Sequence, residues 1–117
     1  MKELTVTFSR AQIEAYARAS GDLNPIHLDD AFARRVGLPG VIAHGMLQMG
    51  LAARVVGGGA RLRRLSVRFA AMVQPGDTIT FSAASEGERI PIGAHNQSGQ
   101  PVLTKAEAEI APEPGRA

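Results

Sequence analysis

Residues 44–73 read HGMLQMGLAARVV, GGGA and RLRRLSVRFAAMV, and this stretch decides the fold. Residues 44–56 are apolar at almost every position, which predicts a helix that is buried on nearly all sides. After the glycine run at 57–59 the apolar period changes to two, which is typical of a strand. One face of this strand would consist of Leu65, Val67, Phe69, Ala71 and Val73. A buried helix followed by a strand indicates that a sheet lies against the helix.

The chain after this strand repeats the strand pattern. Pro75–Asp77 form a turn, residues 78–83 alternate, residues 86–88 turn again, and Ile90 and Ile92 begin a third strand. The last strand would place on one face Val102, Thr104, Ala106, Ala108 and Ile110. We therefore expect an α+β fold in which an antiparallel sheet wraps around one helix. Residues 1–117 would form a single domain, with residues 111–117 as a loose tail.

The chain before the central helix begins with a half-buried strand, because Leu4, Val6 and Phe8 alternate with threonines. Ser9 and Gln12 have the spacing of a capping box and open a helix that stops at Gly21. Residues 22–27 form a polar loop, because proline excludes helical geometry from the residue before it. Asp29 and Asp30 then start a short helix that runs through Val36.

Composition excludes several classes of function. The chain has no cysteine, so disulfides, thiolate metal sites and a cysteine nucleophile are absent. Gln48 and Arg54 interrupt the longest apolar stretch, which is too short to cross a membrane, and no signal-peptide core is visible, so we expect a cytoplasmic protein. Few aromatic residues and no nucleic-acid-binding motif argue against nucleic acid as a partner.

Two surface features predict partners. Five arginines gather in the middle of the chain, where they either form a solvated surface or contact phosphates or an acidic partner. They are Arg54, Arg61, Arg63, Arg64 and Arg68. A helix-wrapping sheet of this size also leaves an edge and an apolar face exposed. Pairing with a second copy would bury both, so we expect a homodimer.

The polar loop Ser20-Gly21-Asp22-Leu23-Asn24-Pro25-Ile26-His27 holds a carboxylate and an imidazole five residues apart. Such a pair can act as general acid and base, because histidine titrates near neutral pH and a carboxylate can orient it or bind the same water. In the alternative interpretation, Asp22 only closes an Asx turn and His27 is a structural loop histidine. Spacing alone leaves both interpretations open.

A second segment, Ile42-Ala43-His44-Gly45-Met46-Leu47, places His44 and Gly45 at the start of the predicted central helix. Backbone N–H groups at a helix N-terminus lack partners and attract negative charge, so Gly45 can present an N–H to a developing oxyanion. In the alternative interpretation, the two residues only make a tight entry into the helix.

The two segments together resemble a known family. YARASGDLNPIHLDDAFA at Tyr16–Ala33, followed by GVIAHGMLQMGLA at Gly40–Ala52, resembles the MaoC-like, (R)-specific enoyl-thioester hydratases and dehydratases. The pattern G-D-x-N-P-[IL]-H is specific, and the downstream A-H-G-M supports the match. The resemblance extends in order of elements over the whole chain.

The resemblance implies a hotdog fold and an activity on acyl thioesters of coenzyme A or acyl carrier protein. Asp22 and His27 match the residues that hold the catalytic water and exchange protons, and Gly45 matches the oxyanion donor. Asn24 and His44 would support the site. The acyl chain would enter an apolar tunnel beside the helix, for which the candidates are Met46, Leu47 and Met49. The implied reaction needs neither a metal nor another cofactor.

Two departures qualify the resemblance. Some members carry a serine nine residues after the histidine of the His-Gly pair, where this chain has Ala53, so a role for that hydroxyl is absent. The loop at residues 57–61 is short and rich in glycine, which favours a more open substrate channel.

Three alternatives to a hydratase stay open. The first is a hotdog thioesterase, and the second is a non-catalytic subunit that needs a partner. The third is a metal site built from Asp22, His27, His44 and His95, which no characteristic ligand spacing supports.

Overall fold

The computed structural model describes residues 2–57, 61–84 and 87–111. One antiparallel sheet has the strand order β1-β3-β4-β5-β2. The strands are β1 (Lys2–Thr7), β2 (Arg61–Phe69), β3 (Thr78–Ala83), β4 (Arg89–His95) and β5 (Pro101–Ala111). The helices are α1 (Arg10–Ser20), the 3-10 turn η1 (Pro25–His27), α2 (Asp30–Arg35) and α3 (Gly45–Val56). The α+β architecture is as expected.

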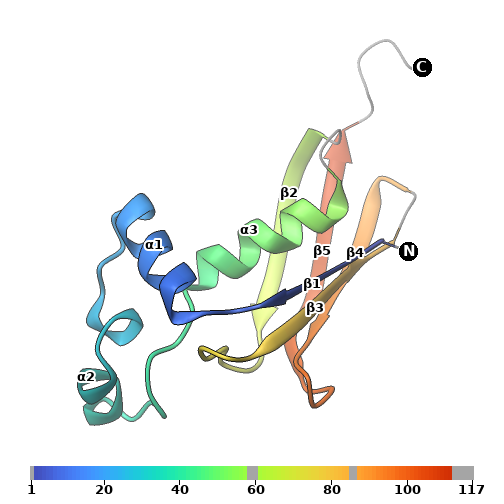
Figure 1. Ribbon diagram of the computed structural model, residues 1–117. Helices are drawn as coiled ribbons and strands as arrows, with labels where there is room; N and C mark the ends of the chain where they lie inside the picture. Colours follow the sequence, from blue (N-terminus) through green and yellow to red (C-terminus); the bar gives the residue numbers. More distant parts are fainter. Residues whose placement is uncertain (1, 58–60, 85–86, 112–117) are drawn as a thin grey trace.

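Helix α3 lies inside the curve of the sheet (Figure 1). It contacts β1 and β3 at one end of the strand order and β2 at the other end, so the sheet bends around it. The contacts bury Ala52, Val55 and Val56 of α3 against apolar side chains of the sheet, such as Ile79 and Phe81. Helices α1 and α2 lie beyond one end of the sheet, and α1 is next to the first turn of α3 (Figure 1).

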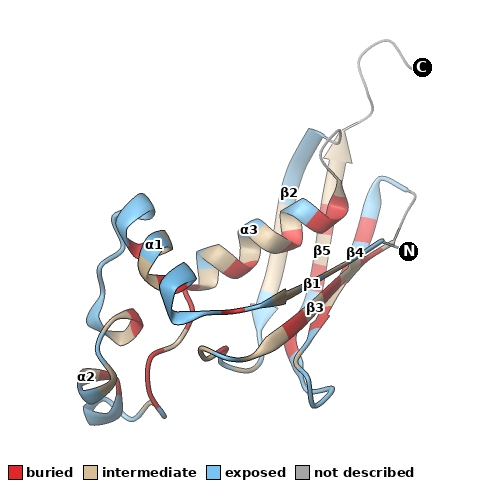
Figure 2. Ribbon diagram, viewed as in Figure 1, coloured by how far each residue is buried: buried red, intermediate tan, exposed pale blue. Residues whose placement is uncertain are grey.

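The prediction that α3 is buried on nearly all sides is wrong for this chain. Met46, Gly50 and Arg54 are exposed, and they lie four residues apart on one side of the helix (Figure 2). Met46 is the most exposed large apolar side chain, at 64%. The sheet of one copy covers one side of the helix and leaves the opposite side uncovered.

Strand β2 ends earlier than its alternating pattern suggested. It stops at Phe69, and Ala71 and Val73 follow in a segment outside the sheet. Val73 is fully buried whereas Phe69 is 48% exposed, so the predicted single apolar face does not extend over these residues. The reason is tertiary: Val73 accepts a hydrogen bond from the N–H of Ala43 and is held against the segment before α3.

Strand β5 contains a bulge that its sequence pattern did not reveal. Lys105 has φ of 47°, and the register with β2 shifts between Ser66 and Arg68. An extra residue in one strand inverts the alternation, so Leu103 and Ala106 both face the core. The prediction that residues 102, 104, 106, 108 and 110 share one face is correct after the bulge, where Ala106 and Ala108 are buried. Before the bulge Val102 is buried as predicted, but so is Leu103, which was assigned to the opposite face.

The N-terminal predictions are confirmed. Leu4 and Val6 of β1 are half-buried while Thr5 and Thr7 are exposed. Ser9 and Gln12 form the capping box of α1, and Gly21 ends the helix at φ of 80°, a conformation that glycine adopts at little cost. Asp29 caps α2. The glycine-rich loop at 57–61, the turn at 86–88 and the tail at 111–117 lie wholly or partly outside the described residues. Within them, no helix is both long and apolar enough to cross a membrane.

Candidate active site

The polar loop after α1 is built from two consecutive Asx turns. Asp22 Oδ1 accepts a hydrogen bond of 3.3 Å from the N–H of Asn24, and Asn24 Oδ1 accepts one of 3.2 Å from the N–H of Ile26. Asn24 also caps η1, whose last residue is His27. The turns lead the chain from the exposed Asp22 to His27, which is only 7% exposed. Asn24 therefore makes its side-chain hydrogen bond within the loop itself.

One hydrogen bond fixes the protonation pattern of the neutral His27 ring. Nδ1 lies 2.7 Å from the carbonyl oxygen of Ile42, and because a carbonyl oxygen only accepts, Nδ1 carries the hydrogen. In the neutral ring, Nε2 then has a free lone pair, which is the form a general base requires. Ile42 is held in turn by a hydrogen bond from its N–H to the carbonyl of Ile26.

Asp22 Oδ2 and His27 Nε2 face each other at 3.9 Å. This distance exceeds that of a direct hydrogen bond and suits a water molecule bound to both atoms. The Asp22 side chain is 53% exposed, so water can reach it. Asp22 thus closes the Asx turn with one oxygen and faces His27 with the other. The Asx turn and the approach to His27 are compatible, because a carboxylate has two oxygens.

His44 lies directly behind this pair. Its ring stacks on His27 with centroids 3.7 Å apart and planes 22° apart, and the ring of Tyr16 contacts it edge-on. His44 Nε2 donates a 3.1 Å hydrogen bond to the backbone carbonyl of Asp22. Burial, with a smaller contribution from His27, lowers the pKa of His44, although the hydrogen bond to Asp22 acts in the opposite direction. His44 therefore stays neutral and holds both members of the pair.

The first turn of α3 faces the site with unpaired donors. His44 occupies the N-cap position, but its side chain makes no capping hydrogen bond because it is turned to Asp22. Within the described residues the N–H of Gly45 has no hydrogen-bond partner, so it can donate to a ligand. A Cβ atom at Gly45 would lie 3.0 Å from Cζ of Phe69, so any larger residue here would require the ring or the helix turn to shift. Sequence reasoning missed Phe69 as part of the site, because it was assigned to the core face of its strand.

A pocket of about 280 Å³ lies beside His27 and Gly45. His27, Gly45 and Gln48 line it together with Phe69 and apolar residues, which are Ile26, Ile42, Ala43, Ala71, Met72 and Val73. None of the three tunnel candidates borders this pocket. Met46 is exposed, Leu47 packs on the core, and Met49 is half-buried elsewhere on the helix. In their place, α3 contributes Gln48, which the sequence showed only as an interruption of an apolar run.

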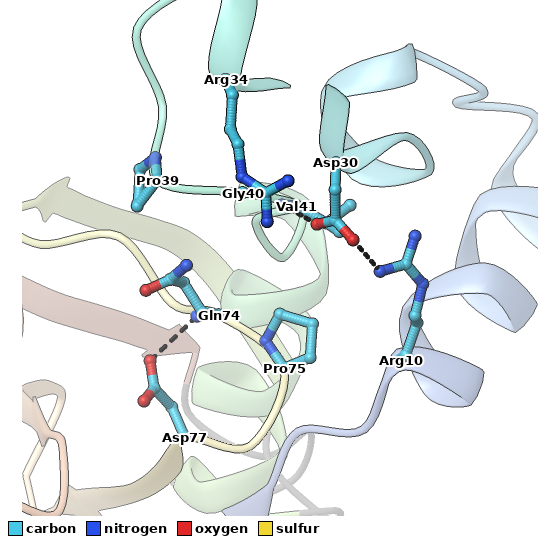
Figure 3. Close-up of a pocket in the computed structure, with 9 residues that line it drawn as sticks. All are labelled: Arg10, Asp30, Arg34, Pro39, Gly40, Val41, Gln74, Pro75 and Asp77. Atoms are coloured by element: carbon cyan, nitrogen blue, oxygen red, sulfur yellow. Dashed lines mark hydrogen bonds and ion pairs between the residues drawn. The ribbon is translucent and has the colours of Figure 1, made fainter. Parts of the chain in front are cut away.

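A polar cluster holds the chain segment that bears Ile42. Asp30 Oδ2 pairs with Arg10 Nη1 at 2.6 Å, and Asp30 Oδ1 accepts a hydrogen bond from the N–H of Val41. Both contacts are visible in Figure 3, at the edge of a separate polar pocket of about 290 Å³. The Val41 N–H and the Arg10 guanidinium lower the pKa of Asp30. Asp30, expected only as a charge at a helix start, thus ties α1 to the residue before Ile42.

The four residues considered as metal ligands separate into two groups. Asp22, His27 and His44 offer atoms within 4.8 Å of one another, whereas His95 lies exposed on β4. Ring nitrogens donate in the plane of the ring, and the planes of His27 and His44 are nearly parallel, so their lone pairs do not converge as tetrahedral Zn²⁺ coordination requires. The arrangement suits proton transfer to a water better than metal binding.

Comparisons with known proteins identify the family of this chain. The family model of the MaoC like domain matches residues 1–109. R-hydratase PhaJ1 from Pseudomonas aeruginosa has 32% identity and a TM-score of 0.80, over 95% of this chain and 79% of that chain. The (R)-hydratase from A. caviae involved in PHA biosynthesis has 29% identity and a TM-score of 0.80, over 92% and 90% of the two chains.

Longer curated proteins also match. The peroxisomal hydratase-dehydrogenase-epimerase of Neurospora crassa is 34% identical over 99 residues, which is 83% of this chain and 11% of that protein. The chain spans only 3–15% of the length of the curated relatives it matches. The matched structures and the sheet curved around α3 confirm the hotdog fold. The chain belongs to the MaoC-like hydratase and dehydratase family.

Proposed function

We propose that this chain adds water to 2-enoyl thioesters and removes it from (3R)-hydroxyacyl thioesters. The observation that carries the proposal is the 3.9 Å gap between Asp22 Oδ2 and His27 Nε2, because His27 also lines a pocket that Gly45 at the N-terminus of α3 borders. A water-binding pair and an oxyanion donor are the two elements that hydration of a conjugated thioester requires.

In hydration, a water bound between Asp22 and His27 loses a proton to His27 Nε2 while its oxygen bonds to the β-carbon. The electron pair of the double bond moves to the thioester oxygen, where the Gly45 N–H stabilises it. The proton on His27 then passes to the α-carbon on the same face, and the pair returns to its starting state. Dehydration is the reverse. Loss of one oxyanion donor costs on the order of 3 kcal/mol in well-studied enzymes.

The substrate would be an acyl thioester of coenzyme A or acyl carrier protein. The walls of the pocket beside His27 are mostly apolar and suit an acyl chain. Of the five arginines singled out in the sequence, four are exposed along β2, and the fifth, Arg54, is exposed on α3. We propose that they contact the phosphates of the carrier or an acidic carrier surface.

We also propose a homodimer. Met46, Phe69 and Met72 are about half-exposed or more, and Phe69 and Met72 border the pocket that contains His27. A second copy that covered this surface would remove apolar area from water and shield the pocket. Light scattering of the purified chain tests this proposal, which a monomer at micromolar concentration would contradict.

The decisive experiment is hydration of crotonyl-CoA by the purified chain, followed as loss of enoyl absorbance. We expect activity in the wild type and losses of about 10² to 10⁴-fold in Asp22→Asn and His27→Ala. Chiral analysis of the product should give the (3R) alcohol. Release of free thiol would instead indicate a thioesterase. Inactivity of the folded wild type alone would favour the partner-dependent subunit.

A further inference from the structure

Gln48 is a buried polar residue whose side-chain oxygen has no hydrogen-bond partner in the described part of the chain. It lies in the first turn of α3 and is only 4% exposed. Its Oε1 atom is buried without a partner. Buried polar side chains usually have partners, because an unsatisfied group costs folding free energy. The position of Gln48 therefore calls for an explanation outside the folding of the isolated chain.

The surroundings of Gln48 indicate where a partner would come from. The residue borders the pocket that also holds His27 and Gly45, and the remaining walls of that pocket are apolar. Its backbone N–H is already used, since it donates to the carbonyl of His44. The pocket thus has three polar groups. The His27 ring and the Gly45 N–H have roles in the proposed reaction, and the amide of Gln48 is the third.

The geometry of α3 indicates which carbon atoms of a bound acyl chain would lie beside Gln48. Gln48 follows Gly45 by three residues, which is a rise of about 4.5 Å along α3. If the thioester oxygen lies at the Gly45 N–H and the acyl chain continues along the pocket, that rise corresponds to about three to four carbon–carbon bonds. The carbon atoms beside Gln48 would then be the fourth and fifth of the acyl chain.

We propose that Gln48 makes this site selective for acyl thioesters with a hydroxyl group on the fourth or fifth carbon. This inference rests on the proposed function. A hydroxyl both donates and accepts, so it satisfies the amide in either orientation. A site built to hydrogen-bond a substrate hydroxyl discriminates strongly against the analogue that lacks it, because its buried amide stays unpaired. A plain alkyl chain offers no hydrogen bond, so Gln48 Oε1 stays unpaired, as it is in the free protein.

The test compares kcat/KM for trans-2-hexenoyl-CoA and for its 4-hydroxy and 5-hydroxy derivatives. Gln48→Met is the matched variant, since methionine has a similar length and no hydrogen-bonding amide. We expect the wild type to prefer one hydroxylated substrate by about tenfold or more and Gln48→Met to lose that preference. Gln48→Leu, which packs differently, should lose it as well. Gln48→Met should also melt at a higher temperature than the wild type, because it removes an unpaired buried group.

Binding separates this proposal from that of the hydratase reaction. The saturated ligands hexanoyl-CoA, 4-hydroxyhexanoyl-CoA and 5-hydroxyhexanoyl-CoA are compared by the rise in Tm that each produces. A larger rise with a hydroxylated ligand in the wild type, absent in Gln48→Met, supports selectivity even if no enoyl substrate is hydrated. Equal effects of Gln48→Met on plain and hydroxylated compounds, in rate and in binding, would overturn the role of Gln48 and leave the Asp22–His27 reaction standing.

Discussion

His27 Nε2 and Asp22 Oδ2 lie 3.9 Å apart, while His27 Nδ1 lies 2.7 Å from the carbonyl oxygen of Ile42. The two nitrogens of one ring thus have separate tasks. The hydrogen bond of Nδ1 to Ile42 fixes the orientation of the ring, and Nε2 faces the space where a water would bind. Substitutions that imitate one nitrogen or the other can separate these tasks.

His27→Asn and His27→Gln form such a pair. The amide nitrogen of asparagine reaches the position of Nδ1 and can keep the bond to Ile42, whereas that of glutamine extends towards Nε2. Both variants lack a titratable base, so we expect kcat to fall by about 10² to 10⁴-fold in each. His27→Asn should keep the higher Tm. Hydration rates and thermal melts measure both effects, and equal Tm values in the two variants would contradict the assignment of Nδ1.

His44 should make stability depend on pH. Its pKa is lowered below the usual 6.5, mainly by burial. Between the lowered pKa and 6.5 the unfolded chain binds more protons than the folded one, so stability falls as pH decreases through this range. We expect the free energy of unfolding of the wild type to decrease from about pH 7.5 to about pH 5 by more than that of His44→Phe. Urea unfolding at both pH values measures it, and parallel decreases in the two proteins would refute it.

Gly45 and Phe69 should be coupled. In Gly45→Ala the new methyl group meets the Phe69 ring, 3.0 Å from Cζ, and displaces either the ring or the first turn of α3. A displaced oxyanion donor should lower kcat by about 10-fold to 100-fold. Phe69→Ala removes the obstacle, so the double variant should recover part of the loss. A double-mutant cycle on kcat measures the coupling, and strictly additive effects would show that the contact is unimportant.

Asp30 should act on the site from a distance. Asp30→Ala removes both the Arg10 ion pair and the acceptor for the Val41 N–H, which together hold the segment before Ile42. We expect kcat/KM to fall by about tenfold, because His27 loses a fixed partner. Asp30→Asn keeps an acceptor oxygen for Val41 and should lose less. If Asp30→Asn and Asp30→Ala were equally impaired, the Val41 hydrogen bond would have no part in positioning the site.

Local signals in the sequence predicted much of this fold. The capping box of Ser9 and Gln12 and the stop at Gly21 involve neighbouring residues only, so they are visible in the sequence. The bulge at Lys105 is not, because it depends on the partner strands of β5. The exposure of Met46 was missed for a related reason, since an apolar pattern shows that a face must be covered but not which chain covers it.

The site was predictable where the sequence carries its motif and not beyond. Asp22, His27 and Gly45 stand in two short segments with a recognisable pattern. The structure places Asp22 3.9 Å from His27, and His27 and Gly45 line one pocket. The stacking of His44 on His27 joins residues 17 positions apart, and the contact of Phe69 with Gly45 spans 24 positions. Tertiary packing creates such contacts, and no local sequence pattern predicts them.

The uncapped N-terminus of α3 has a consequence for how the protein responds to its substrate. His44 occupies the N-cap position, but its Nε2 donates to the backbone carbonyl of Asp22, so the helix has no side-chain cap. A thioester oxygen at the Gly45 N–H would complete the helix in the way that a serine or aspartate cap does elsewhere. Such a ligand would be a structural part of the fold for as long as it is bound, and the central helix would be capped only in the complex.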